Sequence, residues 1–303
     1  MYRALGFGSL ALVIFTIIAL LGEPASRNDY MAAIRAKHAR LKELGSPKII
    51  IIGGSNAAFG FDSQSLEQAF GSPVVNMGLH GSLGTHFMVE EILGEIGRGD
   101  IVLVSLEYSN INRPLKLDDE IYLAVDRYPA ALQMIPYHQW PKVLSTIVVL
   151  RMQATWMSFI GSATPLDTTM IYTASNFNEY GDFLIPSSTE KDFRHDLRFG
   201  VHKDTEIPSR FWTLLDRLES IVHEQDGKVF YAWPAIARST HSPEVDASIE
   251  MDFNAKGRSF IGKRERYILD DSLFLDTKYH TRSRGKEIRT KLLIKDLKAE
   301  LAQ

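Results

Sequence analysis

Short apolar runs alternate with segments of helical periodicity along most of the chain after residue 47. We predict strands at the runs KIIII (48–52), PVVNM (73–77), DIVLVSL (100–106), KVFYAW (228–233) and SLFLD (272–276). Apolar residues recur at helical spacing in SQSLEQAF (63–70), GTHFMVEEILGEI (84–96), SRFWTLLDRLESIVHEQ (209–225) and GKEIRTKLLIKDLKAEL (285–301). This alternation predicts an α/β fold with a doubly wound, mostly parallel sheet of five strands.

Residues 110–205 interrupt the alternation and are predicted to form an insertion between the third and fourth strands. The segment is rich in aromatic residues and is broken by Pro114, Pro129, Pro136, Pro141 and Pro165. Its most apolar piece, VLSTIVVL, is too short to cross a bilayer before Arg151. Insertions of this kind often shape a substrate site.

The N-terminal segment from Ala4 to Gly22 carries no charge and is long enough to span a bilayer as a helix. We therefore expect a membrane anchor over residues 1–26, with a cleaved signal peptide as the alternative. The rest of the chain, residues 27–303, forms the predicted α/β domain, and it begins with a polar helix or linker up to Gly45. Basic residues are more frequent after the apolar segment than before it, and by themselves they favour a cytoplasmic domain.

Composition excludes several classes of protein. The 303 residues are 45% hydrophobic and 23% charged, which is typical of a globular chain and argues against disorder. A net charge of -3, with basic and acidic residues intermixed, argues against a nucleic-acid partner. The chain has no cysteine, so disulfides, thiolate catalysis and Cys-based metal sites are excluded, and we expect no cofactor or metal.

The first predicted strand runs into Gly53, Gly54 and Ser55, and ligands bind beyond the carboxyl ends of strands in open parallel sheets. Ser55 is thus a candidate nucleophile, and Gly78, after the second strand, is a candidate donor to an oxyanion. A plain turn, or a phosphate-binding loop without the P-loop Gly-Lys-Ser/Thr ending, are the alternatives. His80 and His86 are predicted to be surface or packing residues.

Two further groups of polar residues follow predicted strands. The third strand ends in SLEYSNIN, which places Glu107 and Asn110 at the same sheet edge, either as site residues or as a solvated charge and a turn residue. Near the C-terminus, Asp276 and His280 lie on a loop just before the last helix. A serine nucleophile needs a base, and often a carboxylate that orients it, and this pair can supply both.

The order of these parts resembles that of the SGNH (GDSL-like) hydrolase superfamily over residues 48–110 and 207–301. The resemblance implies a three-layer α/β/α fold with Ser55 as nucleophile, Gly78 as oxyanion donor, His280 as base and Asp276 as its partner. The chain has GGSN in place of Gly-Asp-Ser, and three residues instead of two separate Asp276 from His280. Either Asn110 or Glu107 takes the position of the superfamily's Asn.

Membrane-anchored members of this superfamily handle acyl groups in the bacterial envelope. The resemblance therefore implies a single-pass protein of the inner or cytoplasmic membrane, with an extracytoplasmic domain that acts as a serine esterase or O-acyltransferase. Its expected partners are an acylated or acceptor glycan and a multi-pass membrane acyltransferase. The alternatives are a non-catalytic envelope scaffold of the same fold and a binder of a phosphate ligand at the GGSN turn.

Overall fold

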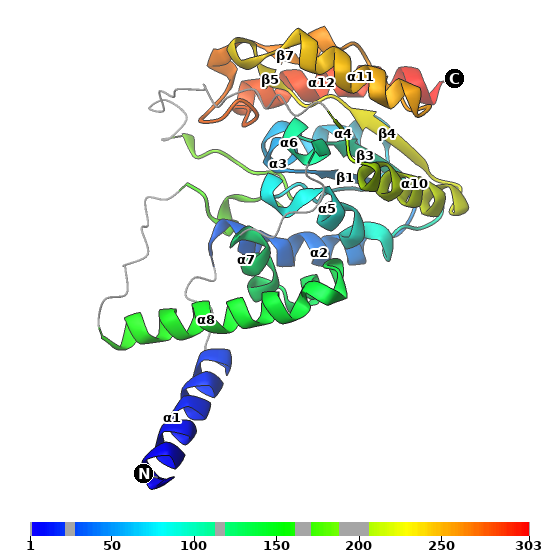
Figure 1. Cartoon of the computed structure of the whole chain (residues 1–303). Helices are drawn as coiled ribbons and strands as arrows, with labels where there is room; N and C mark the ends of the chain where they lie inside the picture. Colours follow the sequence, from blue (N-terminus) through cyan, green and yellow to red (C-terminus); the bar gives the residue numbers. More distant parts are fainter. Residues whose placement is uncertain (1, 22–27, 113–118, 161–170, 188–205, 303) are drawn as a thin grey trace.

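The computed structural model describes residues 2–21, 28–112, 119–160, 171–187 and 206–302 (Figure 1). Its central sheet has five parallel strands in the order β2-β1-β3-β4-β6. They are β1 (Ile49–Gly53), β2 (Val74–Asn76), β3 (Ile101–Ser105), β4 (Lys228–Ala232) and β6 (Phe260–Ile261). The mixed α/β architecture and the five-stranded parallel sheet confirm the coarse prediction.

The prediction of the fifth strand was wrong. The fifth strand of the sheet is β6, which pairs with β4, whereas the segment 272–276 lies near the 3-10 turn η8 (Asp271–Leu273) and has only an isolated bridge between Phe274 and Thr281. A two-residue strand is too short to show an apolar period. SLFLD is apolar because Phe274 and Leu275 are buried in two small hydrophobic clusters, the first with Ala237 and the second with Phe59.

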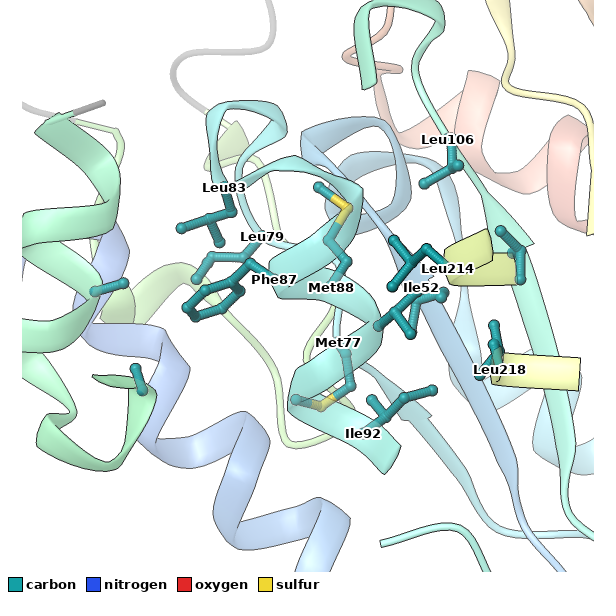
Figure 2. Packing of buried hydrophobic residues seen from close by; sticks show 14 of the residues in the cluster. Ile52, Met77, Leu79, Leu83, Phe87, Met88, Ile92, Leu106, Leu214 and Leu218 are labelled. Atoms are coloured by element: carbon teal, nitrogen blue, oxygen red, sulfur yellow. The ribbon is translucent and has the colours of Figure 1, made fainter. Parts of the chain in front are cut away.

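Alternate residues of the strands face two separate hydrophobic cores, which is the pattern of a sheet covered on both faces. Ile50 and Ile52 pack with α2 (Ile34–Glu43), α5 (Gly84–Leu93) and α10 (Ser209–Glu224). Figure 2 shows the α5 and α10 side chains around Ile52. Ile49 and Ile51 pack with α4 (Ser63–Phe70) and α12 (Ser283–Leu301). The arrangement is compatible with a three-layer α/β/α fold.

The four predicted helices of the α/β repeat are present, and α4 has the predicted bounds. Its start is fixed by Asp62, whose side chain accepts a hydrogen bond from the Ser65 amide, and its end by Gly71 in the left-handed conformation. The sequence prediction missed α11 (Pro243–Ala255), which packs Ile249 and Phe253 into the first core. The remaining short elements are α3 (Ser55–Gly60), α6 (Tyr108–Asn112) and a two-stranded sheet of β5 (Ile236–Ala237) and β7 (Ile268–Leu269).

The described parts of the predicted insertion form helices that extend the first core. They include α7 (Asp119–Arg127), the 3-10 helices η3 (Pro129–Met134), η4 (Tyr137–Gln139) and η5 (Ala174–Asn176), and α8 (Trp140–Phe159). In Figure 1, α7 lies beside α2, and α8 lies beyond them on the side away from the sheet. Residues 113–118, 161–170 and 188–205 of the insertion lie outside the described residues.

The N-terminal segment that was predicted as a membrane anchor is helical. Helix α1 (Tyr2–Leu21) occupies the segment predicted to span a bilayer, contacts α8 and projects away from the α/β body (Figure 1). Among the described residues, however, no helix combines the length and apolar character needed to cross a membrane. Residues 22–27, which include the end of the predicted anchor, lie outside the described part.

The segment after the predicted N-terminal anchor is helical, as predicted, which excludes the solvated linker, and it packs as part of the domain. It forms η1 (Tyr30–Ala33) and α2, and the side chains of Lys37 and His38 are buried. Lys37 donates hydrogen bonds to the carbonyls of Asn76 and Gly181, so its charge is buried against backbone oxygens. Arg35, Lys42 and Glu43 of α2 face solvent, whereas Lys37 and His38 face the domain interior.

Candidate functional site

Ser55 and Glu107 meet because of the register between β1 and β3. Gly53 and Ser105 are paired at the carboxyl ends of these strands, and each candidate residue follows its strand by two positions. The Ser55 hydroxyl donates to Oε1 of Glu107 at 2.9 Å, and the Asn56 amide donates to the same oxygen at 3.1 Å. Ser55 and Glu107 are each only 9% exposed. Glu107 is therefore a partner of the candidate nucleophile and not a solvated charge.

Two glycines surround the carboxylate of Glu107. A Cβ on Gly54 would lie 2.7 Å from Oε1, and one on Gly81 would lie 2.6 Å from Oε2. Asn110 lies on the same edge and donates a hydrogen bond from its side-chain amide to the Gly81 carbonyl. Both residues whose role the sequence left open thus belong to the site. Glu107 accepts a hydrogen bond from Ser55, and Asn110 donates one to the neighbouring loop at Gly81.

His280 and Asp276 form a pair on the loop before α12, as the sequence predicts. Nδ1 of His280 lies 2.7 Å from Oδ1 of Asp276, and the other carboxylate oxygen accepts a hydrogen bond from the Tyr172 hydroxyl. The His280 ring stacks on Phe59, with 4.0 Å between centroids and 5° between planes. A carboxylate on one ring nitrogen fixes the orientation of an imidazole and leaves its other nitrogen for proton transfer.

Phe59 links the two halves of the site, because it lies on the short helix α3 four residues after Ser55. Tyr30 gives further evidence that the halves are close. Its pKa is raised well above the ordinary value, mainly by burial and then by the negative charges of Glu107 and Asp276. No hydrogen bond joins Ser55 to His280, although both lie in the described part of the chain.

Gly78 follows β2 and lies against α3, the helix that begins with Ser55. The Gly78 amide donates to the side-chain oxygen of Asn76 at 2.9 Å, and a Cβ on Gly78 would lie 2.5 Å from Cβ of Ala57. This amide is thus already used in a packed contact behind α3. The glycine of the second strand's loop that lies against Gly54 and Glu107 is Gly81.

A buried arginine supports the Ser55 turn from behind. Arg289 of α12 donates to the Asn56 carbonyl at 2.5 Å and to the Ser105 hydroxyl at 2.7 Å, and it lies over the Phe61 ring. Its side chain is fully buried, and burial lowers its pKa to about 9. Arg289 therefore joins the helix that follows the His280 loop to the turn that carries Ser55.

Sequence reasoning missed Tyr172, Tyr30 and Arg289. Tyr172 lies in the irregular insertion, and no local pattern connects it to Asp276. His80 and His86, predicted as surface or packing residues, are both half-buried, and His80 packs edge-on against Tyr30 and accepts a hydrogen bond from the Ser82 amide. Within the described ranges, no group of three or more His, Cys, Asp or Glu side chains is placed to hold a metal ion.

Comparison of the chain with protein-family models gives no match, and comparison with curated proteins gives none either. The candidate site is therefore argued from its own geometry. A hydroxyl at a sheet edge and a carboxylate-bound histidine, joined through one aromatic ring, form a set of groups suited to nucleophilic acyl transfer.

Proposed function

We propose that the protein is a serine-dependent O-acyl esterase or O-acyltransferase that acts on a polysaccharide or glycan of the cell envelope. The observation that carries the proposal is the His280–Asp276 pair, whose imidazole stacks on the helix that begins with Ser55. A serine, an imidazole and an orienting carboxylate are the groups that this chemistry requires. Their resemblance to the SGNH arrangement supports the same reaction class.

In the proposed reaction, Ser55 Oγ bonds to the acyl carbonyl carbon and its proton passes to Nε2 of His280. Asp276 holds Nδ1 and stabilises the imidazolium. The protonated His280 then gives the proton to the departing alcohol oxygen as the ester bond breaks. Water or a glycan hydroxyl attacks the acyl-enzyme in the second half of the reaction, which separates an esterase from a transferase.

The hydrogen bond from Ser55 to Glu107 adds one requirement. For His280 to receive the proton, the hydroxyl hydrogen turns from Glu107 toward the imidazole when substrate binds.

The donors to the oxyanion remain part of the proposal. Gly81 is the better candidate than Gly78, because Gly81 lies at the Ser55 turn and the Gly78 amide is bound to Asn76.

Attachment to a membrane, with an extracytoplasmic domain and a multi-pass acyltransferase as partner, also belongs to this proposal. Support comes from large apolar side chains that are exposed on α1 and on α8, which contact each other. On α1 these are Leu10, Leu12, Val13, Ile14 and Ile17. Exposed apolar surface of this kind is typical of proteins that meet lipid or a protein partner.

A non-catalytic scaffold is the second candidate, and one observation favours it. The Ser55 hydroxyl is bound to a carboxylate, with no hydrogen bond to His280. In a scaffold, the Ser55–Glu107 pair would stabilise the sheet edge, and the edge would bind glycan without chemistry.

Hydrolysis of p-nitrophenyl acetate by the full-length chain distinguishes the two candidates. We expect Ser55→Ala and His280→Ala to lower the rate at least about a hundredfold, the order typical for loss of a nucleophile or a general base. Ser239→Ala and His223→Ala are matched controls on exposed residues and should keep the full rate. A folded wild type whose rate does not exceed that of uncatalysed hydrolysis would favour the scaffold.

A further inference from the structure

We infer that the substrate carries an ammonium group and that Glu107 binds this group beside Ser55. The inference rests on the proposed function and names the class of ester that the site accepts. It starts from the two oxygens of the Glu107 carboxylate, which have different surroundings. Within the described part of the chain, Oε1 accepts both hydrogen bonds that the carboxylate receives, one from Ser55 and one from Asn56.

Oε2 of Glu107 has no hydrogen-bond donor and no ion-pair partner among the described residues. Oε2 lies against Gly81, where a Cβ would be only 2.6 Å away, so the carboxylate can take this position because Gly81 has no side chain. Glu107 is more than nine-tenths buried, and a buried carboxylate is costly unless it is paired. The free oxygen is also not among the fully enclosed polar atoms that lack a partner. It is therefore open to a small cation.

The reaction itself gives a second reason for a cation. Negative charge develops on the substrate oxygen as Ser55 attacks, and Glu107 is bonded to the attacking hydroxyl. Two negative charges at this separation repel each other, which opposes the reaction. An ammonium group on the substrate would neutralise Glu107 and remove the repulsion. An anionic substrate group in the same place would increase it.

Aromatic rings near Glu107 suit the same ligand chemistry. The Tyr279 hydroxyl accepts a hydrogen bond from the Tyr108 amide, and the two rings pack edge-on. The pKa of Tyr279 is raised by burial and then by the charge of Glu107, so this ring lies within the field of the carboxylate. Carboxylates together with aromatic faces are the groups that bind ammonium ligands.

Lys278 is a basic side chain of the chain itself whose pKa responds to Glu107. Burial lowers the pKa of Lys278, and the Glu107 charge raises it in part. Its Nζ lies 5.2 Å from the centroid of the Tyr279 ring and forms no ion pair with Glu107. If Lys278 neutralises Glu107, the enzyme shows no preference for cationic substrates. If the substrate ammonium neutralises Glu107, the enzyme prefers them.

The first test compares p-nitrophenyl glycinate with p-nitrophenyl propionate, whose acyl groups differ mainly in an ammonium in place of a methyl. Each kcat/KM is divided by the uncatalysed rate at pH 6.5, where the α-amino group is protonated. We expect at least a tenfold preference for the glycyl ester in the wild type and none in Glu107→Gln. Glu250→Gln, on an exposed glutamate, is the matched control and should keep the preference.

A second pair locates the ammonium group in the substrate. Acetylcholine and 3,3-dimethylbutyl acetate share one acyl group and differ in the charge of the alcohol. A preference confined to this pair assigns the cation to the alcohol side, and a preference confined to the glycyl pair assigns it to the acyl side. Either supports the inference. Ser55-dependent hydrolysis without a preference in either pair overturns the inference and leaves the esterase intact.

Binding is measured separately, so that the cation site can be judged even if none of the esters is hydrolysed. Calorimetric titration with tetramethylammonium and with glycinamide uses the full chain and the same variants. Binding that is lost in Glu107→Gln and kept in Glu250→Gln supports the site. No binding of either cation to the wild type overturns it.

Discussion

Arg289→Met removes a buried positive charge from behind Ser55, and two opposing effects decide its cost. Burial of the charge is unfavourable, and it therefore lowers the pKa of Arg289 to about 9 from an ordinary value of 12.5. At about 1.4 kcal/mol for each tenfold change, that difference corresponds to about 5 kcal/mol. The variant recovers this energy. It loses the hydrogen bonds to the Asn56 and Trp233 carbonyls and to the Ser105 hydroxyl, which still accepts from the Asn56 side chain; each buried acceptor left without a partner costs about 1–3 kcal/mol.

The two effects nearly cancel, so we expect the free energy of unfolding of Arg289→Met to lie within about 2 kcal/mol of the wild-type value. Arg289→Lys keeps the buried charge, and its single ammonium cannot replace the planar fork that reaches both acceptors. The Lys variant should therefore be less stable than the Met variant. Both should lose ester hydrolysis, because the Asn56 carbonyl that Arg289 holds follows the nucleophile directly.

Urea unfolding followed by tryptophan fluorescence measures the difference. Lys295→Met, on the exposed face of the same helix, is the control and should change the free energy of unfolding by no more than about 0.5 kcal/mol. A Lys variant more stable than the Met variant by over about 1 kcal/mol would refute the reasoning, since it would mean that the buried charge is favourable.

Three further variants test other parts of the molecule. Burial lowers the pKa of Lys37 to about 7. Between about pH 7 and 10 the unfolded chain therefore binds more protons than the folded one, and urea unfolding should show wild-type stability rising relative to Lys37→Met by up to about 1.4 kcal/mol per pH unit. Gly81→Ala places a methyl 2.6 Å from a Glu107 oxygen and should lower kcat/KM for p-nitrophenyl acetate about tenfold. Tyr172→Phe removes a hydrogen bond to Asp276 worth about 1 kcal/mol and should lower kcat about fivefold with little change in KM.

Each of these expectations has an outcome that would contradict it. A stability difference for Lys37→Met that is flat from pH 7 to 9 would mean that Lys37 is protonated equally in both states. Gly45→Ala is the control for Gly81→Ala, because no atom lies within 4 Å of a Cβ at Gly45. Equal activity of these two alanine variants would show that Glu107 moves away without consequence. An unchanged kcat in Tyr172→Phe would show that Asp276 needs no second partner.

The parts of the fold that the sequence predicted are those with strong local signals. Four consecutive Ile residues in β1, and the helix between the Asp62 cap and Gly71, are examples. Strand β6 has two residues and no period of its own, so its place depends on pairing with β4. Helix α11 was missed although Ser242 and Pro243 gave the N-cap signals of a helix start.

The candidate site divides in the same way. Ser55 was predicted because it closely follows a strand, and Asp276 and His280 because they lie close together on a loop just before a helix. The role of Glu107 depends on the pairing of Gly53 with Ser105, because this register places the residues after β1 next to the residues after β3. The register cannot be predicted from the sequence of either segment alone. Arg289 has the sequence context of a charged, exposed helix residue, and only the packing of α12 on α3 buries it.

The most direct test of the account is the site of covalent labelling by a fluorophosphonate probe, identified by mass spectrometry of the digested full-length chain. The account predicts that the label lies on Ser55, that it persists in the Ser239→Ala control, and that it falls sharply in His280→Ala. A folded wild type that takes up no label, or label that remains in Ser55→Ala, would contradict the assignment of Ser55 as nucleophile.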